Sequence, residues 1–166
     1  MAVNIYPAGD RFFSQGLTHL FLGKSPHEEL LVLNLARWSL REIVLSDWME
    51  MKGMQPSVII TVNALLPVAD YLKIAYGNAC VLNSSQLILP ELCSGGLMTE
   101  RLSSLSSKRS NRLTTTEYRT LKCFFKLMTV DEEAWRYKVS CKTVYGMRSR
   151  VAAKLGVKRL TEILTW

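Results

Sequence analysis

The sequence predicts two domains of different class: an α/β domain with a parallel sheet, followed by an all-α domain. Three observations in the 166 residues support this division. Apolar runs alternate with helical patterns up to residue 94, capped helical patterns without strand signals fill 113–166, and a serine-rich stretch separates the two. The composition, with 48% apolar and 21% charged residues, is ordinary for folded domains and excludes wholesale disorder.

The N-terminal part, residues 1–94, alternates strand-like and helical segments. The expected strands are 3–6, 30–35, 58–62 and 79–82, and the expected helices are 12–22, 39–51, 68–76 and 86–92. The run Leu30–Leu35 is nearly all apolar, as expected for a strand that is covered on both faces. Strand and helix in regular alternation predict a parallel sheet flanked by helices.

A composition shift separates this part from the rest of the chain. Between Leu105 and Leu113 the sequence holds only serine, basic residues and asparagine. Such a segment buries too little apolar surface to fix its own conformation. We therefore interpret residues 95–112 as an interdomain linker.

The C-terminal part, residues 113–166, predicts four helices. Thr114 with Glu117, and Thr129 with Glu132, have the spacing of capping boxes, which start helices near 115–127 and 130–137. Ser140 is an expected N-cap for a third and longer helix, and residues 161–166 are expected to form a brief fourth. The apolar positions of the third helix share a narrow arc that should face the first two helices, and Gly156 follows as its expected end: Val144, Met147, Val151 and Leu155.

The positive charge is concentrated in the same part. Residues 1–107 contain seven basic and nine acidic side chains, a net charge of −2, whereas 108–166 contain fourteen basic and five acidic side chains, a net charge of +9. A small basic domain of this kind is typical of nucleic-acid binding. A generic basic surface remains the alternative on charge alone.

The third helix has the composition expected of a helix that approaches DNA. Opposite its apolar arc it carries polar, basic and very small residues, so that it could reach the floor of a major groove. Lys142 lies in the first turn, where the helix dipole disfavours a cation and a nearby phosphate would compensate.

Residues 113–166 resemble the DNA-binding domain of the LuxR/FixJ (NarL-type) transcription regulators. The resemblance runs without a gap over the following positions: Leu113 to Glu117, Leu121, Thr129, Glu132, Ala134, 139–144, 148–150, 154–157 and 162–164. It implies a four-helix helix-turn-helix domain whose third helix enters the major groove and whose fourth helix supports dimerisation. The implied base-reading residues are Tyr145, Gly146 and Ser149, and the implied backbone contacts are Lys142, Thr143, Arg148 and Arg150. The sequence departs from the family pattern at Glu133, Lys138 and Gly146.

The order of elements in residues 1–94 is similar to a response-regulator receiver domain that lacks one strand–helix unit after its first helix. The family's aspartyl phosphorylation needs an acidic pair for Mg²⁺, an acceptor carboxylate and a lysine. The matching positions here are Ala8, Gly9, Asn34 and Asn83, and Asp10 is one position out of register. An amide such as Asn34 cannot form an acyl phosphate. We therefore expect no phosphoacceptor and a degenerate receiver-like domain.

No other chemistry is indicated. The four cysteines and two histidines have no metal-ligand spacing, and no catalytic constellation or cofactor motif is present, so we expect no enzyme, metal site or cofactor. We also expect no membrane span and no secretory signal, and hence a cytoplasmic protein.

The function that these expectations favour is sequence-specific, phosphorylation-independent transcription regulation by a dimer on double-stranded DNA. The alternative is an auxiliary protein that heterodimerises with a typical response regulator and modulates its DNA binding. The sequence leaves homodimer and heterodimer open. The expected contacts of either dimer, which intramolecular packing could equally explain, are Val68, Leu72, Ile74, Ile163, Leu164 and Trp166.

Overall fold

The computed structural model describes residues 3–8, 11–21, 30–46, 56–77, 79–84 and 111–166. The described strands are β1 (Val3–Tyr6), β2 (Leu30–Leu35), β3 (Val58–Thr61) and β4 (Cys80–Asn83). The described helices of the sheet half are α1 (Arg11–Phe21), η1 (Arg37–Ser39), α2 (Leu40–Leu45), η2 (Asn63–Leu65) and α4 (Leu66–Ala75). The C-terminal helices are α7 (Thr115–Phe125), α8 (Val130–Tyr137), α9 (Cys141–Lys154) and η5 (Leu160–Thr165).

The four strands form one parallel sheet in the order β1-β2-β3-β4. Val3 pairs with Leu30 across β1 and β2, and Val32 pairs with Val58 across β2 and β3. All four residues of β3 are buried. The prediction of a parallel α/β sheet is thus confirmed, and the apolar run of β2 is explained by burial on both faces.

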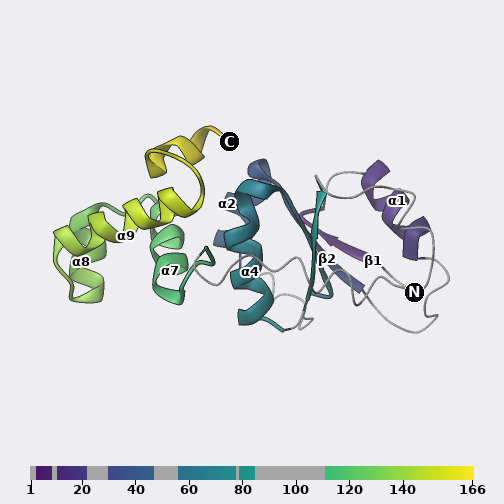
Figure 1. The fold of residues 1–166 in the computed structure, drawn as a ribbon, viewed down its shortest axis with the longest axis horizontal. Helices are drawn as coiled ribbons and strands as arrows, with labels where there is room; N and C mark the ends of the chain where they lie inside the picture. Colours follow the sequence, from purple (N-terminus) through teal and green to yellow (C-terminus); the bar gives the residue numbers. More distant parts are fainter. Residues whose placement is uncertain (1–2, 9–10, 22–29, 47–55, 78, 85–110) are drawn as a thin grey trace.

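Helices cover the two faces of this sheet unequally (Figure 1). On one face, Leu17 of α1 packs with alternate residues of the strands: Val32, Val58, Ile60 and Leu82. On the other face, α2 and α4 pack with the remaining alternation: Leu31, Leu33, Leu35, Ile59 and Val81. Only the second face continues into the C-terminal helices.

The C-terminal helices begin where the capping patterns predict. Thr114 accepts a hydrogen bond from the Glu117 amide at 3.2 Å, and the Glu117 carboxylate accepts one from the Thr114 amide at 2.8 Å. Thr129 and Glu132 form the same reciprocal pair, at 3.2 and 2.7 Å. These bonds satisfy amides that the first helical turn leaves without partners.

The two halves are joined through α7, which packs against α2 and α4. The rings of Tyr71 and Tyr118 stack with centroids 4.2 Å apart, and the Leu113 amide donates to the Pro67 carbonyl at 3.2 Å. One cluster of buried side chains runs from the sheet into the C-terminal helices. In Figure 1, α7 accordingly lies between the sheet half and the pair α8 and α9.

Several expectations need correction. The helix expected over 39–51 starts with the 3-10 turn η1, and its described α-helical part stops at Leu45, because Ser46 adopts extended backbone and caps the Glu42 carbonyl. The fourth C-terminal helix is a 3-10 helix. The expected helix 86–92 and most of the expected linker lie outside the described residues, so the domain boundaries stay predictions.

The residues expected at the dimer contact differ in their exposure. Val68, Leu72 and Ile163 are buried inside this chain, which excludes them as a free surface. Ile74 and Leu164 are exposed, at 61% and 46%, and Trp166 is half-buried beneath the Arg37 guanidinium. Among the helices that the structure describes, none has the length and apolar character needed to cross a membrane.

Candidate nucleic-acid interface

A short turn between α8 and α9 fixes the direction of α9. Lys138 adopts a left-handed conformation with φ 54°, and the Val139 amide donates to the Ala134 carbonyl at 3.0 Å, which ends α8. Ser140 then accepts a hydrogen bond from the Thr143 amide at 3.1 Å and starts α9 as predicted. Glycine is the residue most often found in the left-handed conformation, which is unfavourable for a lysine such as Lys138.

The predicted apolar arc of α9 faces the first two helices. Val144, Val151 and Leu155 are almost fully buried, whereas Met147 is half-buried and accepts a weak contact from the Thr120 hydroxyl at 3.6 Å. Gly156, with φ 71°, ends the helix in the left-handed conformation expected of its C-terminal glycine.

The opposite face of α9 is open. The exposed residues on it are Lys142, Thr143, Tyr145, Gly146, Ser149 and Arg150. Tyr145 is 62% exposed, and a methyl group built on Gly146 would meet no atom within 4 Å. The Arg150 guanidinium lies along its own helix, with a long contact of 3.4 Å to the Gly146 carbonyl. A second macromolecule could therefore approach this face without displacing any described part of the chain.

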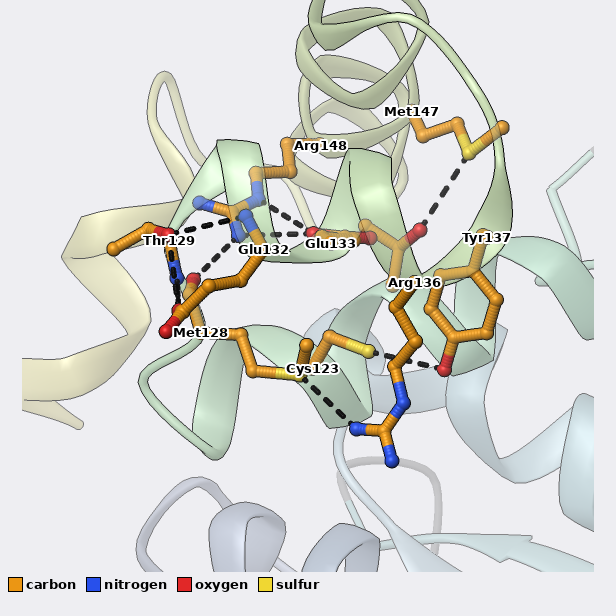
Figure 2. Close-up of polar contacts among 10 residues, drawn as sticks. Cys123, Met128, Thr129, Glu132, Glu133, Arg136, Tyr137, Met147 and Arg148 are labelled. Atoms are coloured by element: carbon orange, nitrogen blue, oxygen red, sulfur yellow. Dashed lines mark hydrogen bonds and ion pairs between the residues drawn. The ribbon is translucent and has the colours of Figure 1, made fainter.

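Arg148 does not fit the expected role of a DNA-backbone contact. Its guanidinium donates to the Glu133 carboxylate at 2.9 and 3.1 Å and to the Met128 carbonyl at 2.8 Å (Figure 2). The side chains of Arg148 and Glu133 are only 17% and 2% exposed. Arg148 follows Val144 by four residues, so it belongs to the inner side of α9, where it joins α8 and the turn before it.

A second ion pair joins α7 to the end of α9. The Lys154 ammonium donates to the Glu117 carboxylate and to the Arg112 carbonyl, both at 2.7 Å. Burial by itself would raise the pKa of Glu117, but hydrogen bonds from Lys154 and Thr114 outweigh it and hold the pKa below its ordinary value.

Every acidic side chain of residues 108–166 has a partner within the chain. Besides the two ion pairs, Glu132 caps α8, Asp131 accepts from the Cys141 thiol at 3.1 Å, and Glu162 accepts from the Arg159 amide at 3.0 Å. Arg148 and Lys154 form ion pairs with Glu133 and Glu117, respectively. Two of the five acids are thus buried in ion pairs and three, Asp131, Glu132 and Glu162, are exposed, so the surface of this half carries more cations than anions.

The carboxyl edge of the sheet carries neutral amides. Asn34, at the position that matches a phosphoacceptor, is half-buried. Its main-chain carbonyl accepts a hydrogen bond from the Ser39 hydroxyl at 2.8 Å. The side-chain amide of Asn83 donates to the Asn63 side-chain carbonyl. Ala8 is exposed, and Gly9 and Asp10 lie outside the described residues. In the described part of this edge, the positions matched to a phosphorylation site hold amides and no carboxylate.

Comparisons with known proteins give two similar solved structures. One is a complex of the two-component response regulator RcsB with DNA, 18% identical, with a TM-score of 0.39, covering 99% of this chain and 98% of that chain. The other contains two RcsB dimers bound to two parallel DNAs, 18% identical, with a TM-score of 0.40, covering 92% and 79%. No protein-family model and no curated protein matches the sequence. At these scores the backbones agree only loosely, so the case for function depends on this chain's own geometry.

Proposed function

We propose that this protein is a sequence-specific, DNA-binding transcription regulator of the LuxR/FixJ (NarL-type) class, with α9 as its recognition helix. One observation carries the proposal: α9 presents an open face of cations, a tyrosine and very small residues, in a half of the chain with a net charge of +9. Phosphates are the ligand that such a surface favours, and a thin helix face suits a major groove.

The proposed roles follow from the positions on this face. Tyr145, Gly146 and Ser149 face the base edges, where only Tyr145 and Ser149 offer side-chain atoms to read them. Lys142, Thr143 and Arg150 contact the sugar-phosphate backbone. Arg148 is assigned instead to the support of α9, because its donors are used by Glu133 and Met128.

The test is a salt titration of duplex DNA binding by fluorescence anisotropy. We expect the affinity to fall steeply with salt, and Lys142→Ala and Arg150→Ala each to reduce the slope of log K against log salt by about 1. Tyr145→Ala should mainly reduce the difference between specific and random duplexes. Arg41→Ala, an exposed arginine on α2, is the matched control and should bind as the parent does. Parent-like binding by the Lys142 and Arg150 variants would exclude this orientation of α9.

We further propose that regulation does not use aspartyl phosphorylation and that the sheet half is a degenerate receiver. The amides at Asn34 and Asn83 support this, because an amide can neither accept a phosphoryl group as an acylphosphate nor supply the lysine cation. Acetyl phosphate should leave the intact mass and the DNA affinity unchanged. A mass increase of one phosphoryl group, removed by hydroxylamine, would disprove the proposal.

The active species is proposed to be a dimer, because one helix in one groove makes too few contacts for specific regulation. Ile74 and Leu164 remain the exposed candidates for the contact. Sedimentation with and without DNA tests this, and a strict monomer that binds one site tightly would exclude it.

A second candidate function is that of an auxiliary protein that binds DNA through a heterodimer with a typical response regulator. Gly146 favours it, since the centre of the recognition face has no side chain and open space around it. Negligible DNA binding by the pure chain, restored by a response regulator, would select this candidate over the first.

A further inference from the structure

A second exposed cluster lies at the junction of α7 and α8, apart from the outer face of α9. It contains two of the most exposed large apolar side chains of the described residues, Trp135 at 85% and Leu127 at 69%. An open hollow of about 430 Å³ runs between them, and we call the residues that line it the α7–α8 patch: Lys126, Leu127, Met128, Glu132, Trp135 and Arg136.

The two exposed apolar side chains of the patch, Trp135 and Leu127, take no part in packing α8 on α9. The inner side of α8 carries the buried residues Glu133 and Ala134, and Glu133 pairs with Arg148 of α9. Trp135 follows Glu133 by two residues, which turns it about 200° around the helix. Its indole therefore points away from α9, and none of the described residues buries it.

Leu127 occupies a position where leucine is unfavourable for the fold. It ends α7 with φ 59°, its amide donates to the Phe124 carbonyl, and the next amide donates to the Cys123 carbonyl. This arrangement favours glycine, because a Cβ atom is disfavoured in left-handed backbone. Burial of the side chain offsets little of this conformational cost, because the side chain is mostly exposed. Packing among the described residues therefore does not account for a bulky apolar side chain here, which makes Leu127 a candidate binding residue.

The charge around these two side chains is positive. Lys126 and Arg136 are exposed on the rim, and the Arg136 guanidinium lies near the Met128 sulfur, at 3.6 Å (Figure 2). The only acid of the patch, Glu132, is exposed and accepts hydrogen bonds from the amide and hydroxyl of Thr129 at 2.7 and 2.9 Å. The patch thus combines an apolar centre with two cations and one carboxylate, a net positive charge.

We propose that the α7–α8 patch docks an acidic peptide segment of a partner protein. A bulky apolar side chain of that segment packs between Trp135 and Leu127, and its flanking carboxylates face Lys126 and Arg136. Duplex DNA matches the cations but offers Trp135 and Leu127 little apolar surface, so a peptide fits the whole patch better. The site is separate from the proposed DNA-binding face and does not depend on it.

The experiment is selection of a phage-displayed library of random dodecapeptides on the full-length protein, with short duplex DNA present as competitor. We expect enriched peptides to share acidic residues around a leucine or an aromatic residue. As synthetic peptides they should bind at least about tenfold more weakly to Trp135→Ser and Leu127→Gly, which corresponds to the loss of one well-packed anchor. Trp38→Ser, at an exposed tryptophan of the sheet half, is the matched control and should bind as the parent does.

A pair of glycine variants separates binding from folding. Leu127→Gly and Lys138→Gly each relieve a left-handed residue, so both should raise the melting temperature by about 3 °C. Only Leu127→Gly should lose the peptides. The proposal is overturned if no acidic peptides are enriched, if the peptides bind the patch variants as well as the parent, or if Trp135→Ser and Leu127→Gly weaken binding to duplex DNA instead.

Discussion

The sheet half and the helical half of this molecule use polar groups in opposite ways. At the carboxyl edge of the sheet, Asn34, Asn63 and Asn83 provide neutral amides, and the side chains of Asn63 and Asn83 bond to each other. In the helical half, carboxylates are held in ion pairs and caps while cations remain on the surface. The comparison teaches that the described edge of the sheet half is neutral, whereas the helical half buries two carboxylates in ion pairs and leaves most of its cations exposed.

The largest effect is expected where an anion of the helical half is most buried. Glu133→Ala leaves the Arg148 guanidinium without its carboxylate in a site that is only 17% exposed, and should lower the free energy of unfolding by about 4 kcal/mol. Urea denaturation measures this loss. If the acid were merely a surface group, the loss would be below about 1 kcal/mol.

Two further variants sharpen this result. Glu132→Ala removes an exposed capping carboxylate on the same helix and should cost much less than Glu133→Ala. Replacing Glu133 and Arg148 together by leucine should recover most of the loss, because a buried ion pair can often be exchanged for apolar residues. Failure of the double variant to recover would show that the Met128 contact contributes more than the ion pair.

The next effect concerns the junction between the halves. Tyr118→Ala removes a buried ring that stacks on Tyr71, and should lower the free energy of unfolding by about 3 kcal/mol. The parent should melt in one transition, since one cluster of buried side chains connects both halves. Calorimetry of the variant should show two transitions, and a parent that already shows two would contradict the continuous core.

A smaller effect is expected from pH. The pKa of Glu117 is held below its ordinary value by Lys154 and Thr114, so the carboxylate stabilises the fold above the unfolded-state pKa of about 4.3. This contribution is lost as the pH falls through the lower, folded-state pKa. Glu117→Gln should cost about 2 kcal/mol at neutral pH and little at acidic pH. An equal cost at both pH values would show that the charge is not involved.

Most of the fold follows from local sequence patterns. The strands 3–6 and 30–35 and the helix 130–137 have the predicted bounds, since alternating burial and capping boxes act over a few residues. The end of α2 was predicted wrongly, because the apolar pattern gives no sign of the extended backbone at Ser46. The packing of α7 on α4 was not predicted at all, because it depends on Tyr71 and Tyr118, which are distant in the sequence.

The site was predicted less completely than the fold. Helical spacing gives the open face of α9, and the structure leaves Lys142, Tyr145 and Arg150 exposed there. Arg148 was assigned to DNA through the family resemblance, although its spacing from Val144 and Val151 places it on the inner side. Glu133 was the available signal, since an acid in the apolar stripe of α8 requires a buried cation as its partner.

The placement of α1 has a consequence for the hand of the connections in the sheet half. When the strands of a parallel sheet follow one another in sequence order, crossover connections of the same handedness place all their helices on the same face. Right-handed crossover connections are almost universal. Here α1 covers one face and α2 and α4 cover the other, so the connection from β1 to β2 has the opposite hand to the two that follow. An additional strand on the free side of β1, followed by a helix that returns to β2, would give all connections the same hand. The chirality of a single connection is therefore what the removal of one strand–helix unit would leave behind.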